Sequence, residues 1–252
     1  MQDLHVTEWG DGSRVVLVHG SLGFGEETWG GLKPLGDAGF NLVLPDRRGH
    51  GQSPPVEGED YERDAADLVP LLGDGAHLVG HSYGGISALW TAALRPEAVR
   101  SLTLIEPSCF GLVPDDPAAA AYMDLFRALW AQTELSDREF IREFMLLMDF
   151  PPAEINEELL DEVEPAVPVF RAGRPVWDAS VPVAVLNAVM FPTLVISGGH
   201  SPAFDAVCDA LVEAMGATGL VLAGAGHSVP ELADELNPVL ADFWHAAEAR
   251  ED

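Results

Sequence analysis

Short apolar runs alternate with amphipathic stretches along the first part of the chain. Strands of a parallel sheet are apolar on both faces, so the runs rich in valine, leucine and isoleucine predict buried strands at residues 14–18, 40–44, 76–80 and 100–105. Apolar residues recur at helical spacing between these runs, over residues 28–38, 60–73 and 83–95. This alternation predicts the α/β class, with a mostly parallel twisted sheet and helices on both of its faces.

A further strand is expected near the N-terminus, at residues 4–9, where apolar and polar residues alternate. Asp11 and Gly12 separate this strand from the run at residues 14–18. An Asp-Gly pair between two strands is typical of a tight hairpin turn. The sequence therefore predicts that the first two strands form a hairpin.

The pattern changes after Pro107. From Ser108 to about Asn187 we find no run typical of a buried strand, but stretches with helical spacing at residues 118–131, 137–148 and 154–164. Strand and helix patterns then resume, with strands at 192–199 and 218–223 and helices at 202–215 and 230–249. The sequence thus predicts a core formed by residues 1–107 and 191–252. Residues 108–190 are expected to form a helical lid inserted between two strands of the sheet.

The chain carries a formal net charge of −28, from 41 acidic and 13 basic residues among 252. Such an excess of negative charge repels nucleic acids and anionic lipid surfaces, so neither is expected as a partner. The N-terminal residues lack the basic and apolar segments of a signal peptide, and no apolar run approaches the roughly 18–20 residues that span a membrane. We therefore expect a cytoplasmic protein that acts on a small molecule, while its composition leaves the oligomeric state open.

Neither a metal ion nor an organic cofactor is expected, because the histidines and cysteines show no spacing typical of a metal site. Two distant cysteines, Cys109 and Cys208, do not make a disulfide framework, and free buried thiols are expected. The glycine-rich stretch at residues 19–25 lacks the lysine of the G-x-x-x-x-G-K-[ST] motif and does not fit G-x-G-x-x-G. A nucleotide is therefore disfavoured at this loop.

The segment Gly80-His81-Ser82-Tyr83-Gly84 joins a predicted strand to a predicted helix and fits the G-x-S-x-G pattern. In this pattern a serine occupies a sharp, strained turn, and the two glycines avoid collisions between strand and helix. The turn exposes the serine oxygen and directs backbone N–H groups at the helix N-terminus towards a developing anion. The pentapeptide alone is also compatible with a turn that has no chemical role.

Four predicted strands end at or just before a polar residue, namely His19, Asp46, Ser82 and Glu106. Ligands of parallel α/β sheets bind at the carboxyl ends of the strands, so these side chains are expected to gather at one edge of the sheet. This clustering favours a chemical role for Ser82.

In this context the chain resembles the α/β-hydrolase superfamily, in particular its small, lid-bearing serine hydrolases. The resemblance covers essentially the whole chain and rests on the segments VLVHGSLG, LPDRRGHGQS, VGHSYGG and GAGHSVP. It implies the α/β-hydrolase fold and an enzyme with Ser82 as nucleophile and His227 as general base. It also implies an oxyanion hole made by the backbone N–H groups of Ser21 and Tyr83, whose side chains are then free to shape the pocket.

The third member of the expected catalytic triad departs from the usual pattern of the family. The family usually places an aspartate three residues after the glycine that here is Gly198, but this chain has Ser201 at that position. Some relatives place the acid after the preceding sheet strand, where this chain has Glu106. Glu106 is therefore the predicted triad acid, and Asp205 or the lack of a classical acid remain alternatives.

Other polar residues near these motifs are expected to have structural roles. Asp46 is expected to hold loops by hydrogen bonds, and His19, His50 and His81 are expected to pack or to shape loops. His200 lies near the usual acid position and is a possible substrate contact.

The predicted lid is rich in large apolar side chains, and most of them are expected to form its own core while some face the cleft: Phe126, Leu129, Trp130, Phe140, Phe144, Met145, Leu147, Met148 and Phe150. An apolar pocket with few cations suits a neutral, moderately hydrophobic substrate. Arg47 and Arg48 follow a predicted strand end and are the candidates to contact a substrate carboxylate.

The sequence therefore predicts a serine hydrolase that cleaves a small, moderately hydrophobic ester, thioester or lactone through an acyl-enzyme. The same fold also supports C–C bond hydrolysis, perhydrolysis or a lyase step, and the sequence does not separate these. A non-catalytic receptor for a small ligand is a further alternative, motivated by Ser201 at the usual acid position. Haloalkane dehalogenases and epoxide hydrolases of this fold use an aspartate where this chain has Ser82, which disfavours both.

Overall fold

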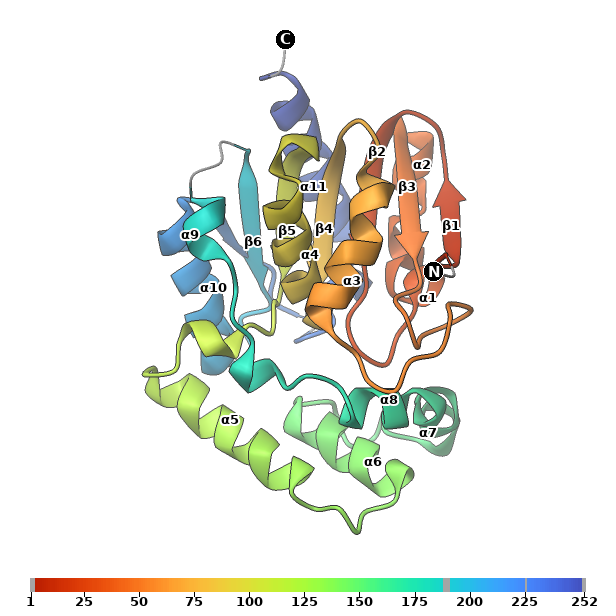
Figure 1. The fold of residues 1–252 in the computed structure, drawn as a ribbon, viewed down its shortest axis with the longest axis vertical. Helices are drawn as coiled ribbons and strands as arrows, with labels where there is room; N and C mark the ends of the chain where they lie inside the picture. The colour runs from red at the N-terminus through yellow and green to blue at the C-terminus, as the bar shows by residue number, and fades with distance from the viewer. Residues whose placement is uncertain (1–2, 188–190, 225, 251–252) are drawn as a thin grey trace.

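The structure is a computed structural model that describes residues 3–187, 191–224 and 226–250. It contains a seven-stranded sheet in the order β1-β3-β2-β4-β5-β6-β7 (Figure 1). The strands are β1 (Val6–Trp9), β2 (Ser13–Val18), β3 (Phe40–Pro45), β4 (Ala76–His81), β5 (Val99–Ile105), β6 (Thr193–Ser197) and β7 (Thr218–Val221). β1 runs antiparallel to β3, and the other neighbouring pairs are parallel. The predicted α/β class with a mostly parallel sheet is confirmed.

The predicted hairpin between the first two strands is wrong. β1 pairs with β3, with Val6 opposite Pro45 and Trp9 opposite Leu42, so β3 lies between β1 and β2. The half-buried, alternating β1 suits the edge of the sheet, whereas the apolar β3 is buried and needs a neighbour on each side. Gly10 and Gly12 have φ angles of 79° and 124° and carry the chain away from a tight hairpin.

Helices cover both faces of the sheet. The core helices are α1 (Gly25–Trp29), α2 (Pro34–Asp37), α3 (Tyr61–Leu68), α4 (Tyr83–Leu94), α10 (Pro202–Met215) and α11 (Ala233–Glu248). Short 3₁₀ turns occur along the chain at Gly30–Leu32, Val69–Leu72, Pro96–Ala98, Phe110–Leu112, Glu164–Ala166, Val176–Asp178 and Val229–Glu231. The single helix predicted over residues 28–38 is thus divided into α1, a 3₁₀ turn and α2, because Pro34 cannot continue a helix that begins before it.

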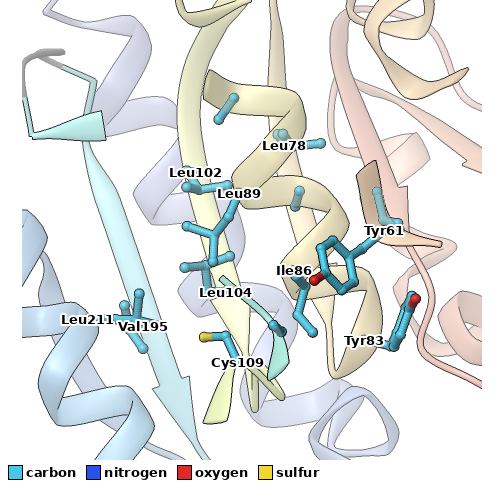
Figure 2. Close-up of a cluster of buried hydrophobic side chains, with 14 of the residues drawn as sticks. Tyr61, Leu78, Tyr83, Ile86, Leu89, Leu102, Leu104, Cys109, Val195 and Leu211 are labelled. Carbon is cyan, nitrogen blue, oxygen red and sulfur yellow. The ribbon is translucent and has the colours of Figure 1, made fainter. Parts of the chain in front are cut away.

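The alternating side chains of each strand separate two hydrophobic clusters. In β2, Val16 and Val18 pack on the face covered by α3, α4 and α10, and Val15 and Leu17 pack on the face covered by α1 and α11. Figure 2 shows part of the first cluster, with side chains of α4 beside those of β5. Cys109 and Cys208 are free and buried, as predicted. Among the described residues no helix is long and apolar enough to cross a membrane.

The chain between β5 and β6 is helical, as predicted. It contains α5 (Pro117–Trp130), α6 (Asp137–Leu147), α7 (Glu157–Val163), α8 (Val167–Arg171) and α9 (Val183–Leu186). Figure 1 shows α5 to α8 as a layer below the end of the sheet to which the parallel strands point. These helices begin at polar caps, since Asp116 caps α5 and a capping box of Ser136 and Glu139 opens α6. The second predicted boundary between lid and core lies between residues 190 and 191, and residues 188–190 beside it are outside the described residues.

Close packing between α4 and the end of β2 fixes where the sheet meets its central helix. A Cβ atom added to Gly84 would lie 2.4 Å from the carbonyl oxygens of Val18 and His19. Both contacts are with backbone, which cannot move aside as a flexible side chain can. Gly84 therefore allows an approach that a larger residue excludes.

We expect Gly84→Ala to lower the free energy of unfolding by about 3 kcal/mol, because the added methyl group overpacks a backbone contact. Gly30→Ala is the matched control: Gly30 has a helical φ of −53° and no atom within 4 Å of an added Cβ. The control is expected to change the free energy of unfolding by less than about 1 kcal/mol. Urea denaturation of both variants tests this, and equal midpoints for the two would contradict the packing argument.

Candidate active site

Ser82 occupies a strained turn between β4 and α4. Its φ angle of 55° lies in the left-handed region, which non-glycine residues rarely adopt. The turn is held by hydrogen bonds from the Ser82 N–H to the Ile105 carbonyl, at 3.0 Å, and from the Gly85 N–H to the Ser82 carbonyl, at 2.9 Å. A Cβ added to Gly80 would lie 2.5 Å from the Gly84 carbonyl oxygen, which explains a glycine at this position. The Ser82 side chain lines a cavity below the sheet.

A hydrogen-bonded chain joins the three residues predicted to form the triad. The Ser82 hydroxyl lies 2.9 Å from His227 Nε2, and His227 Nδ1 lies 3.2 Å from a carboxylate oxygen of Glu106. Because ionised Glu106 can only accept, Nδ1 carries the proton and Nε2 accepts from the Ser82 hydroxyl. The structure thus brings together Ser82, His227 and Glu106 from three different connections of the sheet. Ala225, in the turn before His227, lies outside the described residues.

Glu106 reaches His227 because its backbone also adopts a positive φ angle, of 46°, directly after β5. The Glu106 N–H continues the ladder to the Ile196 carbonyl at 2.8 Å. The second carboxylate oxygen accepts a short hydrogen bond from the Gly198 N–H at the end of β6. The carboxylate is fully buried and held from two sides, so its position relative to His227 is fixed.

The other candidates for the triad acid are engaged elsewhere. The Asp205 carboxylate accepts a hydrogen bond from the Ser197 hydroxyl. Ser201, at the position where the resemblance expects an aspartate, precedes α10 as its N-cap residue. Of the side chains that the structure describes, Glu106 is the carboxylate hydrogen-bonded to His227.

Burial controls the charge of this group of residues. Burial lowers the pKa of His227 to about 3, and burial together with the neighbouring His227 lowers the pKa of His81 to about 3. Burial raises the pKa of the Glu106 carboxyl, and its hydrogen bond from Gly198 opposes this effect. His227 is therefore neutral near pH 7 and can accept a proton, and the adjacent Glu106 carboxylate stabilises the resulting positive charge.

Ser21 and Tyr83, whose N–H groups were predicted to form the oxyanion hole, line the same cavity as Ser82. Tyr83 is the first residue of α4, where backbone N–H groups have no partner inside the helix. We expected the side chains of Ser21 and Tyr83 to be free, but both are held by other residues. The Ser21 hydroxyl donates to Glu59 at 2.6 Å, and the buried Tyr83 ring lies 4.8 Å below the guanidinium of Arg47.

The prediction that Arg47 or Arg48 contacts a substrate carboxylate is wrong. Arg47 is buried and forms ion pairs of 2.7 Å with Glu59 and Asp64, and Arg48 is paired with Asp67. Neither arginine lines the cavity. The cavity is instead lined by Arg174, which the sequence did not single out and which is paired with Glu62 at 2.9 Å and Asp60 at 3.3 Å.

The cavity has a volume of about 290 Å³, and the helical layer supplies much of its apolar wall. Six of the nine large apolar residues noted in the sequence line it, namely Phe126, Trp130, Phe144, Met145, Met148 and Phe150. As expected, most of the nine pack in the layer's own hydrophobic cluster and some of them face the cavity. Several do both, since Met145 lines the cavity and also packs in the cluster around Phe140 and Ile141.

Two further polar residues lie beside the triad, and sequence reasoning missed the first of them, Ser108. The Ser108 hydroxyl lies 3.1 Å from the Ser82 hydroxyl, and the Ser108 N–H donates to the Ser82 carbonyl at 3.2 Å. Its position two residues after the predicted acid was the available signal. His200 lies 3.6 Å from Glu106, and both of its ring nitrogens are buried without a hydrogen bond. His200 was considered as a substrate contact, but it does not line the cavity.

Other polar residues have the structural contacts that the sequence suggested. The Asp46 carboxylate accepts hydrogen bonds from the N–H groups of Gly25 and Gln52, both at 2.9 Å. The ring of His81 lies 2.9 Å from the His227 carbonyl and supports the turn that carries His227. Glu106, His200 and His227 place possible metal ligands within 4.8 Å of one another. The hydrogen bond between Glu106 and His227 already uses the atoms that such a site would need, so we assign no metal to it.

We expect His81 and His227 to titrate below the ordinary histidine pKa of about 6.5, because both rings are buried. In the unfolded chain both rings take up protons near pH 6.5, so their contribution to stability is complete above that pH. This contribution is lost as the pH falls towards about 3, the value for the folded chain.

NMR of ¹⁵N-labelled histidine side chains between pH 4 and 8 measures these values, with His81→Gln and His227→Gln for assignment. A urea-unfolded sample supplies the reference titration. A His227 signal that titrates near 6.5 in the folded protein would contradict the expected effect of burial.

Comparisons with known proteins identify the family and agree with the fold. The sequence model described as the alpha/beta hydrolase family matches residues 15–239. Lipase LipV of Mycobacterium tuberculosis is 30% identical over 250 residues, covering 91% of this chain and 92% of the lipase. A 2-hydroxy-6-oxo-6-phenylhexa-2,4-dienoate hydrolase of Burkholderia cepacia is 29% identical over 167 residues, covering 62% of this chain and 57% of that protein.

The fold is also that of a solved α/β hydrolase from Sphaerobacter thermophilus, with a TM-score of 0.72, 26% identity and 96% of each chain covered. The chain spans 56 to 57% of the length of three curated relatives. The family match, which extends over most of the sequence, confirms the resemblance that the four motifs predicted. The chain belongs to the alpha/beta hydrolase family.

Proposed function

We propose that this protein is a serine hydrolase that cleaves a small, moderately hydrophobic carboxylic ester, thioester or lactone through an acyl-enzyme on Ser82. The observation that carries the proposal is the continuous hydrogen-bonded chain from the Ser82 hydroxyl through His227 to Glu106. A serine hydroxyl is a poor nucleophile at neutral pH and needs a base within hydrogen-bond distance. His227 is that base, and Glu106 holds it in the tautomer that leaves Nε2 free to accept.

In the first half of the reaction the Ser82 oxygen attacks the substrate carbonyl carbon while its proton moves to His227 Nε2. The carbonyl electrons move onto the oxygen, which becomes an oxyanion facing the N–H groups of Ser21 and Tyr83. When the tetrahedral intermediate collapses, His227 returns the proton to the leaving oxygen or sulfur. Ser82 then carries the acyl group.

In the second half a water molecule takes the place of the leaving group. His227 accepts a proton from this water, and the resulting hydroxide attacks the acyl carbon. Collapse of the second intermediate releases the carboxylic acid and returns the proton to Ser82. His227 transfers the proton in each step. Glu106 stabilises the positive charge on His227, and the backbone N–H groups stabilise the oxyanion.

The substrate class follows from the wall of the cavity. We propose that residues 108–190 act as a lid, since they place aromatic and methionine side chains over Ser82 and so favour an uncharged apolar acyl group. Arg174, an arginine in the cavity wall, is neutralised by Glu62 and Asp60. The similarity to a protein named lipase supports an ester substrate.

C–C bond hydrolysis is the second candidate, because one relative is named as a dienoate hydrolase. A dienoate carries a carboxylate, which needs a cationic partner in an apolar pocket. The pairing of Arg174 with two carboxylates makes it a poor partner for such a substrate, so ester cleavage fits the cavity better.

The two free cysteines favour a reducing compartment, in keeping with the cytoplasmic location expected from the sequence.

We expect a fluorophosphonate probe to label the folded protein on Ser82, and p-nitrophenyl esters of medium chain length to be hydrolysed. Ser82→Ala is expected to lose labelling and at least ~10³-fold in kcat, because the remaining groups cannot form the acyl-enzyme. Mass spectrometry locates the label, and a panel of acyl chain lengths and lactones defines the substrate. A folded protein without label on Ser82 would overturn the proposal, and a ligand-binding function retained by Ser82→Ala would point to a receptor instead.

We expect Glu106→Gln to lower kcat roughly 10³- to 10⁴-fold on p-nitrophenyl esters, because a neutral amide neither fixes the tautomer of His227 nor stabilises its positive charge. Asp205→Asn is the matched control, since it removes a nearby carboxylate that contacts Ser197 instead of His227. Its kcat is expected to stay within about fivefold of the wild type. A larger loss in the Asp205 variant than in the Glu106 variant would show that the acid is wrongly assigned.

A further inference from the structure

Arg47 is a fully buried arginine that contacts the loop after β2 directly. Its Nε donates to the His19 carbonyl at 3.0 Å, and its Nη2 donates to the Gly20 carbonyl at 2.9 Å. The same guanidinium forms ion pairs of 2.7 Å with Glu59 and Asp64. A buried guanidinium is costly unless it is paired, and here two carboxylates balance it while its remaining donors hold backbone carbonyls.

The direction of the Gly20 carbonyl determines the direction of the next N–H group. The Gly20 carbonyl accepts from Arg47 Nη2 and also from His19 Nδ1, at 2.7 Å, so it is held towards these two side chains. The Gly20–Ser21 peptide is trans and planar, so its N–H points opposite to its C=O. The Ser21 N–H is therefore directed away from Arg47 and from His19 Nδ1. The loop also lies close to the turn at Ser82, because a Cβ on Gly20 would lie 3.0 Å from the Ser82 Cβ.

His19 also holds the Gly20 carbonyl, as a neutral ring with its proton on Nδ1. Its Nε2 accepts from the Arg47 N–H at 2.9 Å, so its proton resides on Nδ1, the atom beside the Gly20 carbonyl. Burial lowers the pKa of His19 well below its ordinary value, which keeps the ring neutral. Arg47 thus fixes the Gly20 carbonyl by its own guanidinium and through the tautomer of His19.

Glu59 and the Tyr83 ring connect Arg47 to both of the predicted oxyanion-hole residues. One Glu59 oxygen pairs with Arg47, and the other accepts the Ser21 hydroxyl at 2.6 Å. The guanidinium lies 4.8 Å from the centre of the Tyr83 ring. One buried cation is therefore in contact with Tyr83 and, through Glu59 and the Gly20 carbonyl, with Ser21.

We propose that Arg47 is a positioning residue which, with Glu59, holds the Ser21 N–H in the orientation that receives the oxyanion formed on attack by Ser82. This inference rests on the proposed function and adds a residue that acts through the backbone of its neighbours without touching the substrate. The alternative is an ion-pair network that supports only the fold, and the two differ in whether transition-state binding depends on Arg47.

The test compares Arg47→Lys with Arg171→Lys. Lysine keeps the charge but cannot donate in a fork to carbonyls and carboxylates together. Arg171 is a matched control in α8, because it also donates to two backbone carbonyls, those of Leu135 and Gln132, and to the carboxylate of Asp137. The readouts are kcat and KM on a p-nitrophenyl ester, the inhibition constant of an alkyl boronic acid, the melting temperature and the fraction of enzyme titrated by fluorophosphonate. A boronic acid forms a tetrahedral adduct with a serine and so reports on oxyanion binding.

We expect Arg47→Lys to lose about 10²-fold in kcat, in the range of a lost oxyanion-hole donor, with KM within about threefold of the wild type. The affinity for the boronic acid should fall in parallel, while most of the folded enzyme remains titratable. Arg171→Lys should keep kcat and boronic acid affinity within about threefold, even where its melting temperature falls equally. The inference is overturned if the two variants have the same kcat, or if the loss in Arg47→Lys equals its loss of titratable enzyme.

Glu59→Gln and Ser21→Ala decide the matter if Arg47→Lys does not fold. Each weakens the restraint between Glu59 and the Ser21 hydroxyl and leaves the pairing of Arg47 with Asp64 in place. Each is expected to lose about three- to tenfold in kcat and in boronic acid affinity at unchanged KM, and wild-type values for both variants overturn the inference.

If the wild type is itself neither labelled nor active, the proposed function fails and this inference fails with it. If the wild type is active and the variants match it, only this inference fails.

Discussion

The site depends on two neighbouring parallel strands that each end in a non-glycine residue with a positive φ angle. Ser82 follows β4 with φ of 55°, and Glu106 follows β5 with φ of 46°. Such a backbone costs of the order of 1–2 kcal/mol per residue, and it persists where surrounding structure holds it. Here the sheet holds it, since the Ser82 N–H bonds to the Ile105 carbonyl and the Glu106 N–H bonds to the Ile196 carbonyl. Each strand end is fixed by the next strand along, so the side chains leave the sheet at set positions and in a set direction.

His227 completes this arrangement from a turn that passes over the end of β6. The approach is so close that a Cβ on Gly198 would lie 2.0 Å from the Gly226 carbonyl oxygen, which only glycine permits. The Gly198 N–H next to this contact donates to Glu106. The close contact between Gly198 and Gly226 therefore orients the Glu106 carboxylate and allows His227 to reach it. This also accounts for the unusual acid, because the carboxylate at the end of β5 reaches His227 directly and no carboxylate is needed at Ser201, the residue before α10.

Local patterns were sufficient to predict the strands, the turn at Ser82, and His227 and Glu106 as candidates for the triad, because each is encoded by residues next to a strand end. Pairing between strands is not local: Asp11-Gly12 is typical of a hairpin, yet the buried β3 takes the place beside β1. Arg47 was misjudged for the same reason. Its place after β3 could be predicted, but its partners Glu59 and Asp64 are fixed only when the loop and α3 fold back over it. The lining of the cavity depends on how helices pack, which spacing along each helix does not determine.

The two sides of the site are built by different physics. On the side of the nucleophile, hydrogen bonds join Ser82, His227 and Glu106. Burial keeps His227 neutral, and Glu106 stabilises its protonated form. The oxyanion side uses a buried cation and its carboxylates. Burial alone would raise the pKa of Glu59, but Arg47, with His50 and Ser21, lowers it to about 2, and the pKa of Arg47 is itself raised by the two carboxylates against the effect of burial. The Arg47–Glu59 ion pair therefore keeps its charges across the range in which histidines titrate, so in the proposed mechanism protonation of His227 changes reactivity without removing this ion pair beside Ser21.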